Sequence, residues 1–172
     1  MPCNGIKRFY YARKLVLCAF WRHGIHMRAA LLLMFIGAAS PAGEAFGVWK
    51  LNPVRSTLAG NQKSVTLRIE PHSRGEVFTV YTVAVDGRAS TSSTILYFDG
   101  KARDFQDSTC SGTQSSRRLD TRTVEIVREC ANGGPRQLIR RSATQPGELI
   151  LDIAEQRPDG RRYERRLVLE KQ

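Results

Sequence analysis

Histidine is scarce in this chain, and the short motifs that usually carry catalysis are absent. Of three histidines in 172 residues, one, His72, follows residue 45, and it stands beside Pro71 at an expected turn. A lone histidine lacks the spaced partners of a metal site, so we expect no metal and no cofactor. The sequence also has no glycine-rich phosphate loop, no serine-nucleophile elbow and no His-Glu-x-x-His motif. We therefore predict that the protein is not an enzyme, although distant strands can still bring acids together.

The chain also lacks an apolar run long enough to span a membrane. Ala29–Ala39 contains eleven apolar or small residues, whereas a spanning helix needs about 20. Basic residues precede this run and two small-x-small sites follow it, the second ending at Ala45. This is the pattern of an export signal. We predict that residues 1–45 are a leader and signal peptide, and that the protein is periplasmic or extracellular.

Cleavage after Ala45 would leave Phe46 as the first residue of the mature chain. A buried N-terminal helix or an uncleaved anchor is the competing interpretation. Met27 is an alternative start, in which case residues 1–26 result from an overlong start assignment.

Acidic residues are fewer than basic ones, 16 against 27, but the excess is unevenly placed. Residues 1–45 hold +5 of the formal charge of +11, and residues 46–172 hold +6. Aromatic residues such as Phe78 and Phe98 lie in apolar segments instead of along a basic groove. We therefore expect no nucleic-acid partner.

No segment after residue 45 shows the apolar stripe of an amphipathic helix, and the pattern instead has a period of two. Asp86-Gly87, Asp99-Gly100 and Asp159-Gly160 are strong hairpin signals between such segments. We predict one all-β domain over residues 46–172, an antiparallel up-and-down meander of about 8–10 strands that closes into a barrel or half-barrel. A two-sheet sandwich is the alternative.

Cysteine is sparse as well, with four in the chain and no Cys-x-x-Cys pair. Cys3 and Cys18 fall in the predicted leader, which leaves Cys110 and Cys130. A hairpin centred on Asp120 would set residue 116 opposite 124 and residue 110 opposite 130, at a spacing that suits a disulfide. We predict a Cys110–Cys130 disulfide, with two isolated buried thiols as the competing interpretation.

Arginine is abundant and often occurs in dyads, of which only one member can face inward on a strand. Alternation places Arg165 on the apolar face of its strand, and Arg128 on the face of Val124 and Ile126. Gln114, Ser116 and Arg118 would lie across from that second face. A buried cation needs an acid, water or an anionic ligand beside it. An internal salt bridge or exposure at a barrel end is the alternative. The predicted ligand-binding residues are Arg118, Arg128, Tyr81, Tyr97 and Gln114.

The opening of the predicted domain, Gly47-x-Trp49, resembles the Gly-x-Trp signature of lipocalins and related calycin barrels. The stretch GVWKLNPVRS, residues 47–56, is similar to the GTWKLN-x-x-x-S opening of a group of small exported bacterial proteins. Later elements of that pattern are matched by Tyr97–Lys101, Asp120–Glu125 and Leu169–Lys171, so the resemblance spans residues 46–172.

This resemblance implies a lipocalin-like barrel or half-barrel and no particular activity. It implies structural roles for Gly47, Trp49 and Arg165, in which the tryptophan packs across one end of the barrel and the arginine covers its ring. Pro53 would end the first strand. The cysteine pair is not part of the pattern, and residues 46–172 are few for a full lipocalin.

The combined expectation is an exported, non-catalytic lipocalin-like protein that binds a small apolar or amphipathic ligand, with a carboxylate as one option. The alternative is a binding or inhibitory module that uses its outer face against an envelope polymer or protein. Connected space around Arg118 or Arg128 would favour the first function. A filled core with every arginine exposed would favour the second.

Overall fold

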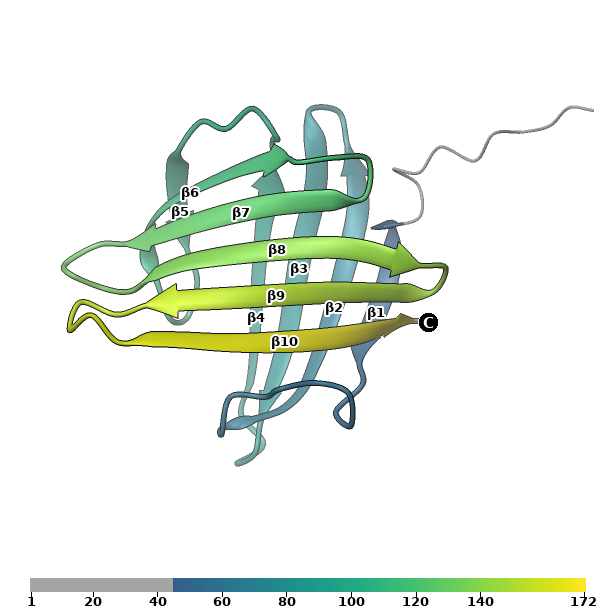
Figure 1. Cartoon of the computed structure of the whole chain (residues 1–172), viewed down its shortest axis with the longest axis horizontal. Coiled ribbons are helices and arrows are strands. Elements are labelled where there is room, and N and C mark those ends of the chain that lie inside the picture. Colours follow the sequence, from purple (N-terminus) through teal and green to yellow (C-terminus); the bar gives the residue numbers. More distant parts are fainter. Residues whose placement is uncertain (1–44) are drawn as a thin grey trace, which may run out of the picture. The chain divides into compact units, whose positions relative to one another are not determined.

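The period-two pattern becomes ten antiparallel β-strands in the computed structural model, which describes residues 45–172 (Figure 1). The strands are β1 Gly47–Leu51, β2 Gln62–His72, β3 Gly75–Ala84, β4 Ala89–Leu96, β5 Arg103–Gln106, β6 Ser111–Arg118, β7 Thr123–Cys130, β8 Arg136–Gln145, β9 Glu148–Gln156 and β10 Arg162–Lys171. The predicted signal segment, apart from Ala45, and the alternative start at Met27 lie outside the described residues. Within residues 45–172, no helix is long and apolar enough to cross a membrane.

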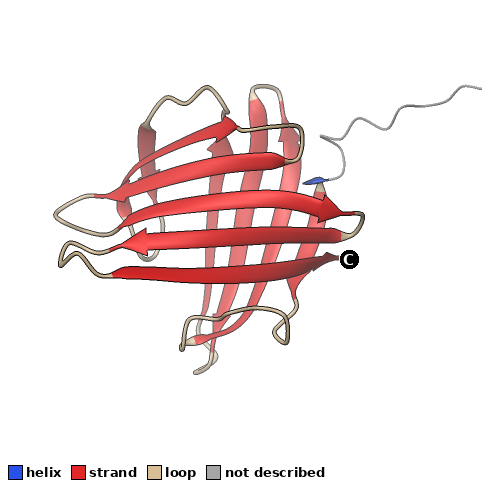
Figure 2. Ribbon diagram, viewed as in Figure 1, coloured by secondary structure: helices blue, strands red, loops and turns tan. Residues whose placement is uncertain are grey.

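The strands form one sheet in the order β4-β3-β2-β1-β10-β9-β8-β7-β6-β5. Among these ten strands, consecutive strands pair along the chain except β4 and β5, and β1 pairs with β10. In Figure 1, β7–β10 cross in front of β2–β4, and Figure 2 shows turns and loops joining them. The predicted up-and-down meander is therefore confirmed, and it closes into a barrel except at one seam between β4 and β5.

Polar residues of β6 hold this β4–β5 seam together. The side-chain nitrogen Nε2 of Gln114 donates to Thr94 Oγ1 at 3.0 Å. Ser116 Oγ accepts the backbone N–H of Phe98 at 3.3 Å, and Ser116 O accepts that of Gly100 at 3.0 Å. Gln114 and Ser116 are both buried. Inward-facing polar side chains thus replace part of the missing ladder.

Alternate residues of eight strands pack into one core between the two halves of the barrel. Burying one such large apolar side chain stabilises the fold by about 1.5–3 kcal/mol. The short β5 and the polar β6 contribute nothing to this apolar cluster. The core residues are Trp49, Leu51, Val65, Leu67, Ile69, Phe78, Leu96, Val124, Ile126, Ile139, Ala143, Leu149, Leu151, Ile153, Leu167 and Leu169.

The Cys110–Cys130 disulfide is present, with the two Cα atoms 5.3 Å apart, but the predicted hairpin register is wrong. Residue 118 pairs with 124 and residue 112 with 130, a shift of two residues. The cause is a longer turn, in which Asp120 Oδ1 accepts the backbone N–H groups of Arg122 and Thr123. The disulfide closes a segment of 20 residues and stabilises the fold by about 3 kcal/mol.

Trp49 is buried, but the structure corrects the residue predicted to cover its ring. Lys171 lies opposite Trp49 in the β1–β10 ladder, and its Nζ is 5.3 Å from the ring centroid. Arg165 is opposite Ile153 on β9, six residues before Lys171 and so about 20 Å away along the strand. The indole Nε1 of Trp49 donates to Ala45 O at 2.8 Å. The prediction failed because the β1–β10 register places Trp49 opposite Lys171, at the end of β10 that is distant from Arg165.

The first strand ends at Leu51, as the prediction from Pro53 required. The following loop, residues 52–61, runs along β10 where a longer β1 would have paired. Ser56 Oγ accepts the backbone N–H of Val168 at 2.9 Å, and the N–H of Thr57 donates to Arg166 O at 2.7 Å. The loop therefore covers the edge of β10 without forming a strand ladder beside it.

Candidate functional site

A cavity of about 580 Å³ lies between the two halves of the barrel. Small-molecule pockets typically have roughly 300–1,000 Å³, so the space suits a small ligand. Its apolar lining consists of Val65, Phe78, Val80, Ile139, Leu151, Ile153 and Leu167. Its charged and amide lining consists of Asn61, Gln62, Arg88, Asp107, Arg128, Gln137, Glu155 and Arg165.

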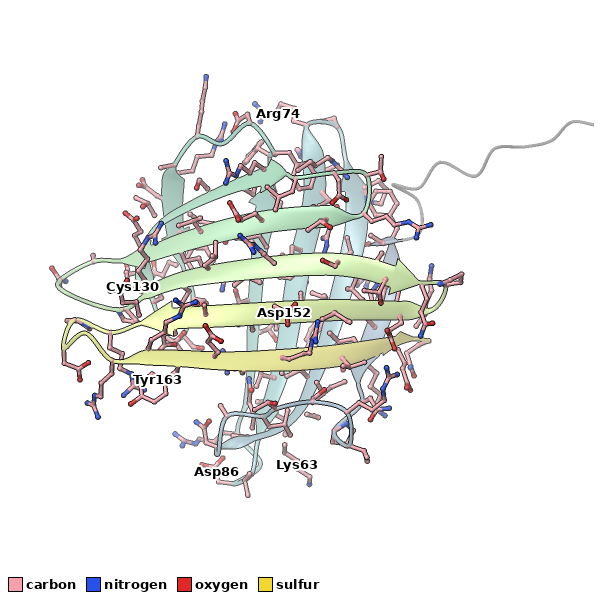
Figure 3. The ribbon with its side chains drawn as sticks, in the orientation of Figure 1. Lys63, Arg74, Asp86, Cys130, Asp152 and Tyr163 are labelled. Atoms are coloured by element: carbon pink, nitrogen blue, oxygen red, sulfur yellow. A yellow bond between two sulfur atoms is a disulfide. The ribbon has the colours of Figure 1, made fainter. Side chains whose placement is uncertain are left out.

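The cavity reaches the surface at one end of the barrel, which we call the mouth. Three connecting segments contribute to its lining there, residues 59–62, 84–90 and 107–109. Figure 3 shows Lys63, which follows the first of these segments, and Asp86, which lies within the second, at one end of the barrel and Arg74 at the other. A ligand can therefore enter between turns without breaking a strand ladder.

Arg128 brings a positive charge into the cavity wall from β7, and it is 8% exposed. Its Nε donates to Gln114 Oε1 at 3.0 Å, and its guanidinium lies 4.2 Å from the centroid of the Phe105 ring. Its Nη1 is 3.6 Å from Asp107 Oδ2, which is longer than a hydrogen bond, and its buried Nη2 has no hydrogen-bond partner among residues 45–172.

Burial lowers the pKa of Arg128, and the charge of Asp107 acts in the opposite direction. An arginine nevertheless stays protonated in a protein. The wall therefore holds a desolvated cation that uses only part of its hydrogen-bonding capacity, an arrangement that costs free energy until an acceptor is supplied.

Asp107 organises the turn beside Arg128. Its Oδ1 accepts the backbone N–H groups of Thr109 and Cys110, at 2.7 and 2.8 Å, and the Thr109 hydroxyl at 2.8 Å. The disulfide then ties Cys110 to Cys130, two residues beyond Arg128 on β7. The turn at the mouth and the cation in the wall are thus held in one local framework.

Arg165 is a second cation in the cavity wall, and it comes from β10. It faces inward with Leu167 and Leu169, as the sequence predicted. Its Nη1 lies 3.4 Å from Gln62 Oε1 on β2, a long contact, and no carboxylate of the described residues lies within ion-pair distance. Arg165 therefore lines the cavity without a matching negative charge.

The buried pair of Arg141 and Glu76 is an interior ion pair that sequence reasoning missed. Arg141 of β8 is 2% exposed, Glu76 of β3 is 1% exposed, and Arg141 Nη1 donates to Glu76 Oε1. The pair joins the two halves of the barrel away from the cavity lining. The alternation of Ile139, Arg141 and Ala143 was a usable signal, because two apolar neighbours on one face indicate that the arginine between them points inward.

Tyr81 was predicted to line the interior, and the structure corrects this placement. It is 41% exposed and faces outward from β3. Apolar residues occupy both faces of that strand, so the pattern alone did not determine the phase. Phe78 packs into the core and Glu76 on the same face pairs with Arg141, so Tyr81, on the opposite face, points outward.

Arg118 and Tyr97 also lie outside the cavity lining. Arg118 is exposed at the end of β6, with its guanidinium 4.2 Å from the Phe98 ring centroid. Tyr97 follows β4, and its ring lies 4.1 Å from the Arg103 guanidinium and 5.3 Å from that of Arg74. Of the predicted ligand-binding residues, the structure brings together Arg128, which lines the cavity, and Gln114, which supports it.

His72 sits at the opposite end from the mouth, where its Nδ1 accepts the backbone N–H of Arg74 at 3.2 Å. Across residues 45–172, no group of three or more His, Cys, Asp or Glu side chains could hold a metal ion. The polar chemistry of the interior is therefore carried by arginines, amides and carboxylates.

Neither a family model nor a curated protein sequence matches this chain. Among solved structures, a Schistosoma mansoni fatty acid binding protein in complex with arachidonic acid matches with a TM-score of 0.54 and 10% identity, over 77% of this chain and 98% of that one. The fold is an antiparallel β-barrel similar to that of this fatty acid binding protein. A second solved structure, EF1p2_mFAP2b bound to DFHBI, matches with a TM-score of 0.45 and 14% identity over the same shares. At these identities the likeness concerns the fold, and the resemblance to the GTWKLN group remains a prediction.

Proposed function

We propose that this protein is an exported, non-catalytic barrel that binds a small amphipathic carboxylate in its cavity. The observation that carries this proposal is Arg128, a buried cation with unused donor capacity in the wall of a cavity that also has an apolar part. A carboxylate would accept from the guanidinium in a charge-assisted hydrogen bond. The apolar part of the ligand would contact Phe78, Ile139 and Leu151.

The Schistosoma protein was solved with arachidonic acid, and we extend that ligand class to this chain as part of the proposal. The outer-face alternative has less support, because exposed arginines there are matched by acids. Arg117 and Arg140 both contact Glu125, and Arg166 contacts Asp152. The connected space lies around Arg128, which was the condition that favours an internal ligand.

An Arg128→Met variant is expected to bind dodecanoate about 10- to 100-fold more weakly than the wild type. A hydrogen bond to a charged group contributes about 1.5–3 kcal/mol, and tenfold corresponds to about 1.4 kcal/mol. Isothermal titration calorimetry on both proteins measures the change. Binding of 1-dodecanol, which has the same chain and no charge, should stay close to the wild-type value.

Arg136→Met is the matched control, because Arg136 is exposed on the outer face of β8 and should leave both affinities unchanged. Equal losses for dodecanoate and dodecanol in Arg128→Met would mean that Arg128 maintains the shape of the cavity and does not bind a carboxylate. No saturable binding of either compound by the wild type would overturn the proposed function itself.

Export is the second part of the proposal, and it predicts that the protein isolated from its own host begins at Phe46. Intact mass and N-terminal sequencing measure this directly. The mass should also show Cys110 and Cys130 protected from alkylation under denaturing, non-reducing conditions. A chain that retains Met1 or Met27 at its N-terminus would contradict cleavage at Ala45.

A further inference from the structure

We propose that the ligand of this cavity carries an acidic group at both ends of an apolar chain, with one group at Arg128 and the other at Arg165. This inference rests on the proposed function and narrows its ligand class. It follows from a second cation in the cavity wall that forms no ion pair with a carboxylate of residues 45–172.

Arg165 differs from the other charged residues of the cavity lining in its partners. Arg88 is paired with Asp86 at 2.6 Å, and Arg128 faces Asp107 at 3.6 Å. The lining acid Glu155 has both oxygens engaged, one by Gln137 at 3.2 Å and the other by Arg157 at 3.2 Å. Arg165 has one long contact, 3.4 Å to the neutral amide of Gln62.

The strand register separates the two proposed anchors of the ligand, Arg128 and Arg165, along the cavity wall. Arg128 is level with Gln137 and Glu155, whereas Arg165 is level with Ile153 and Ile139 in the adjoining inward row. β7 and β10 are three strand spacings apart, which is about 14 Å along the sheet. A carboxylate held at Arg128 therefore leaves Arg165 in need of a second acceptor.

Between Arg128 and Arg165, the cavity wall has a polar row, Gln137 and Glu155, next to Arg128 and an apolar row next to Arg165. Ile139 and Ile153 lie on the wall between β7 and β10, and Phe78 and Val80 face them from β3. A hydrocarbon chain can lie on these side chains while its two ends meet the two guanidinium groups. The arrangement therefore fits an α,ω-dicarboxylic acid better than a fatty acid with a methyl terminus.

Whether the protein binds a diacid more tightly or more weakly than a monoacid distinguishes a cavity with two anchoring arginines from a cavity with one. In a cavity with a single anchor, the second carboxylate of a diacid would be buried without a partner, and the diacid would bind more weakly than the monoacid. In a cavity with two anchors, the diacid gains a charge-assisted hydrogen bond at Arg165. The sign of the affinity difference therefore reports on the second anchor.

The experiment compares dodecanedioate with dodecanoate by isothermal titration calorimetry on the wild type, Arg165→Gln and Arg166→Gln. The wild type is expected to bind the diacid at least about tenfold more tightly, which corresponds to one hydrogen bond to a charged group. Arg165→Gln should lose this preference while keeping its affinity for dodecanoate. Arg166→Gln is the matched control, because Arg166 faces outward and pairs with Asp152, and it should behave as the wild type.

Weaker binding of the diacid than of dodecanoate by the wild type would overturn the inference and leave the proposed function standing. Equal loss of both ligands in Arg165→Gln would also overturn it, since both arginines would then serve one carboxylate. If the wild type binds neither compound, the proposed function fails, and the inference fails with it.

Discussion

An Arg141→Met variant is expected to lower the free energy of unfolding by about 3–5 kcal/mol, because it leaves the Glu76 carboxylate buried without its partner. Glu76 is 1% exposed and lies within the core that joins the two halves of the barrel. Urea unfolding followed by circular dichroism measures the loss. A typical domain is stable by about 5–15 kcal/mol, so the variant should be near the limit of folding.

A Glu76→Leu/Arg141→Met double variant keeps the experiment informative if the single variant does not fold. Replacing both charges with apolar groups removes the unpaired carboxylate, so most of the lost stability should return. Arg140→Met is the matched control, because Arg140 is next to Arg141 on β8 but points outward, where it contacts Glu125 of β7. Similar losses of unfolding free energy for Arg140→Met and Arg141→Met would show that the buried ion pair stabilises the fold no more than an exposed one.

A Trp49→Ala variant is expected to lose about 3–5 kcal/mol of stability, since deletion of a large buried aromatic group leaves a cavity in the core. Trp49 is 1% exposed and lies where β1 meets the end of β10. Loss of its side chain therefore weakens the ladder that closes the barrel. The measurement is the urea midpoint together with the denaturant dependence, which should remain unchanged.

Val48→Ala is the control for Trp49→Ala, because Val48 is the adjacent residue on the outer face and is 39% exposed. Its effect should be within about 0.5 kcal/mol, the usual range for surface positions. Trp49→Phe should lose less than Trp49→Ala because it fills part of the space. If all three variants have the wild-type midpoint, Trp49 does not support closure of the barrel.

Much of the fold was predictable from local patterns. The Asp86-Gly87 and Asp159-Gly160 turns and the period-two alternation indicated an antiparallel meander, because each is a property of neighbouring residues. Asp99-Gly100, predicted as a third hairpin turn, instead lies between β4 and β5, which do not pair. The end of the first strand before Pro53 and the pairing of Cys110 with Cys130 are of the same kind. The hairpin register failed by two residues because the Asp120 side chain stabilises a longer turn, which alternation does not record.

The candidate site was predictable where a strand had one clear apolar face. Val124 and Ile126 determined the direction of Arg128, and Leu167 and Leu169 determined that of Arg165. Tyr81 was misplaced because its strand is apolar on both faces. Arg118 shares the inward phase of Gln114, yet it is exposed because β6 ends there.

The sequence by itself determined the strand content, the disulfide pair and the inward phase of two arginines, since these depend on alternation and on residues close in the chain. The tertiary structure alone decided which residues meet across the barrel. Glu76 meets Arg141 from a strand 65 residues away, and Lys171, not Arg165, covers Trp49. Such contacts depend on the closing register between β1 and β10, and that register is set by the packing of the whole core, not by any local pattern.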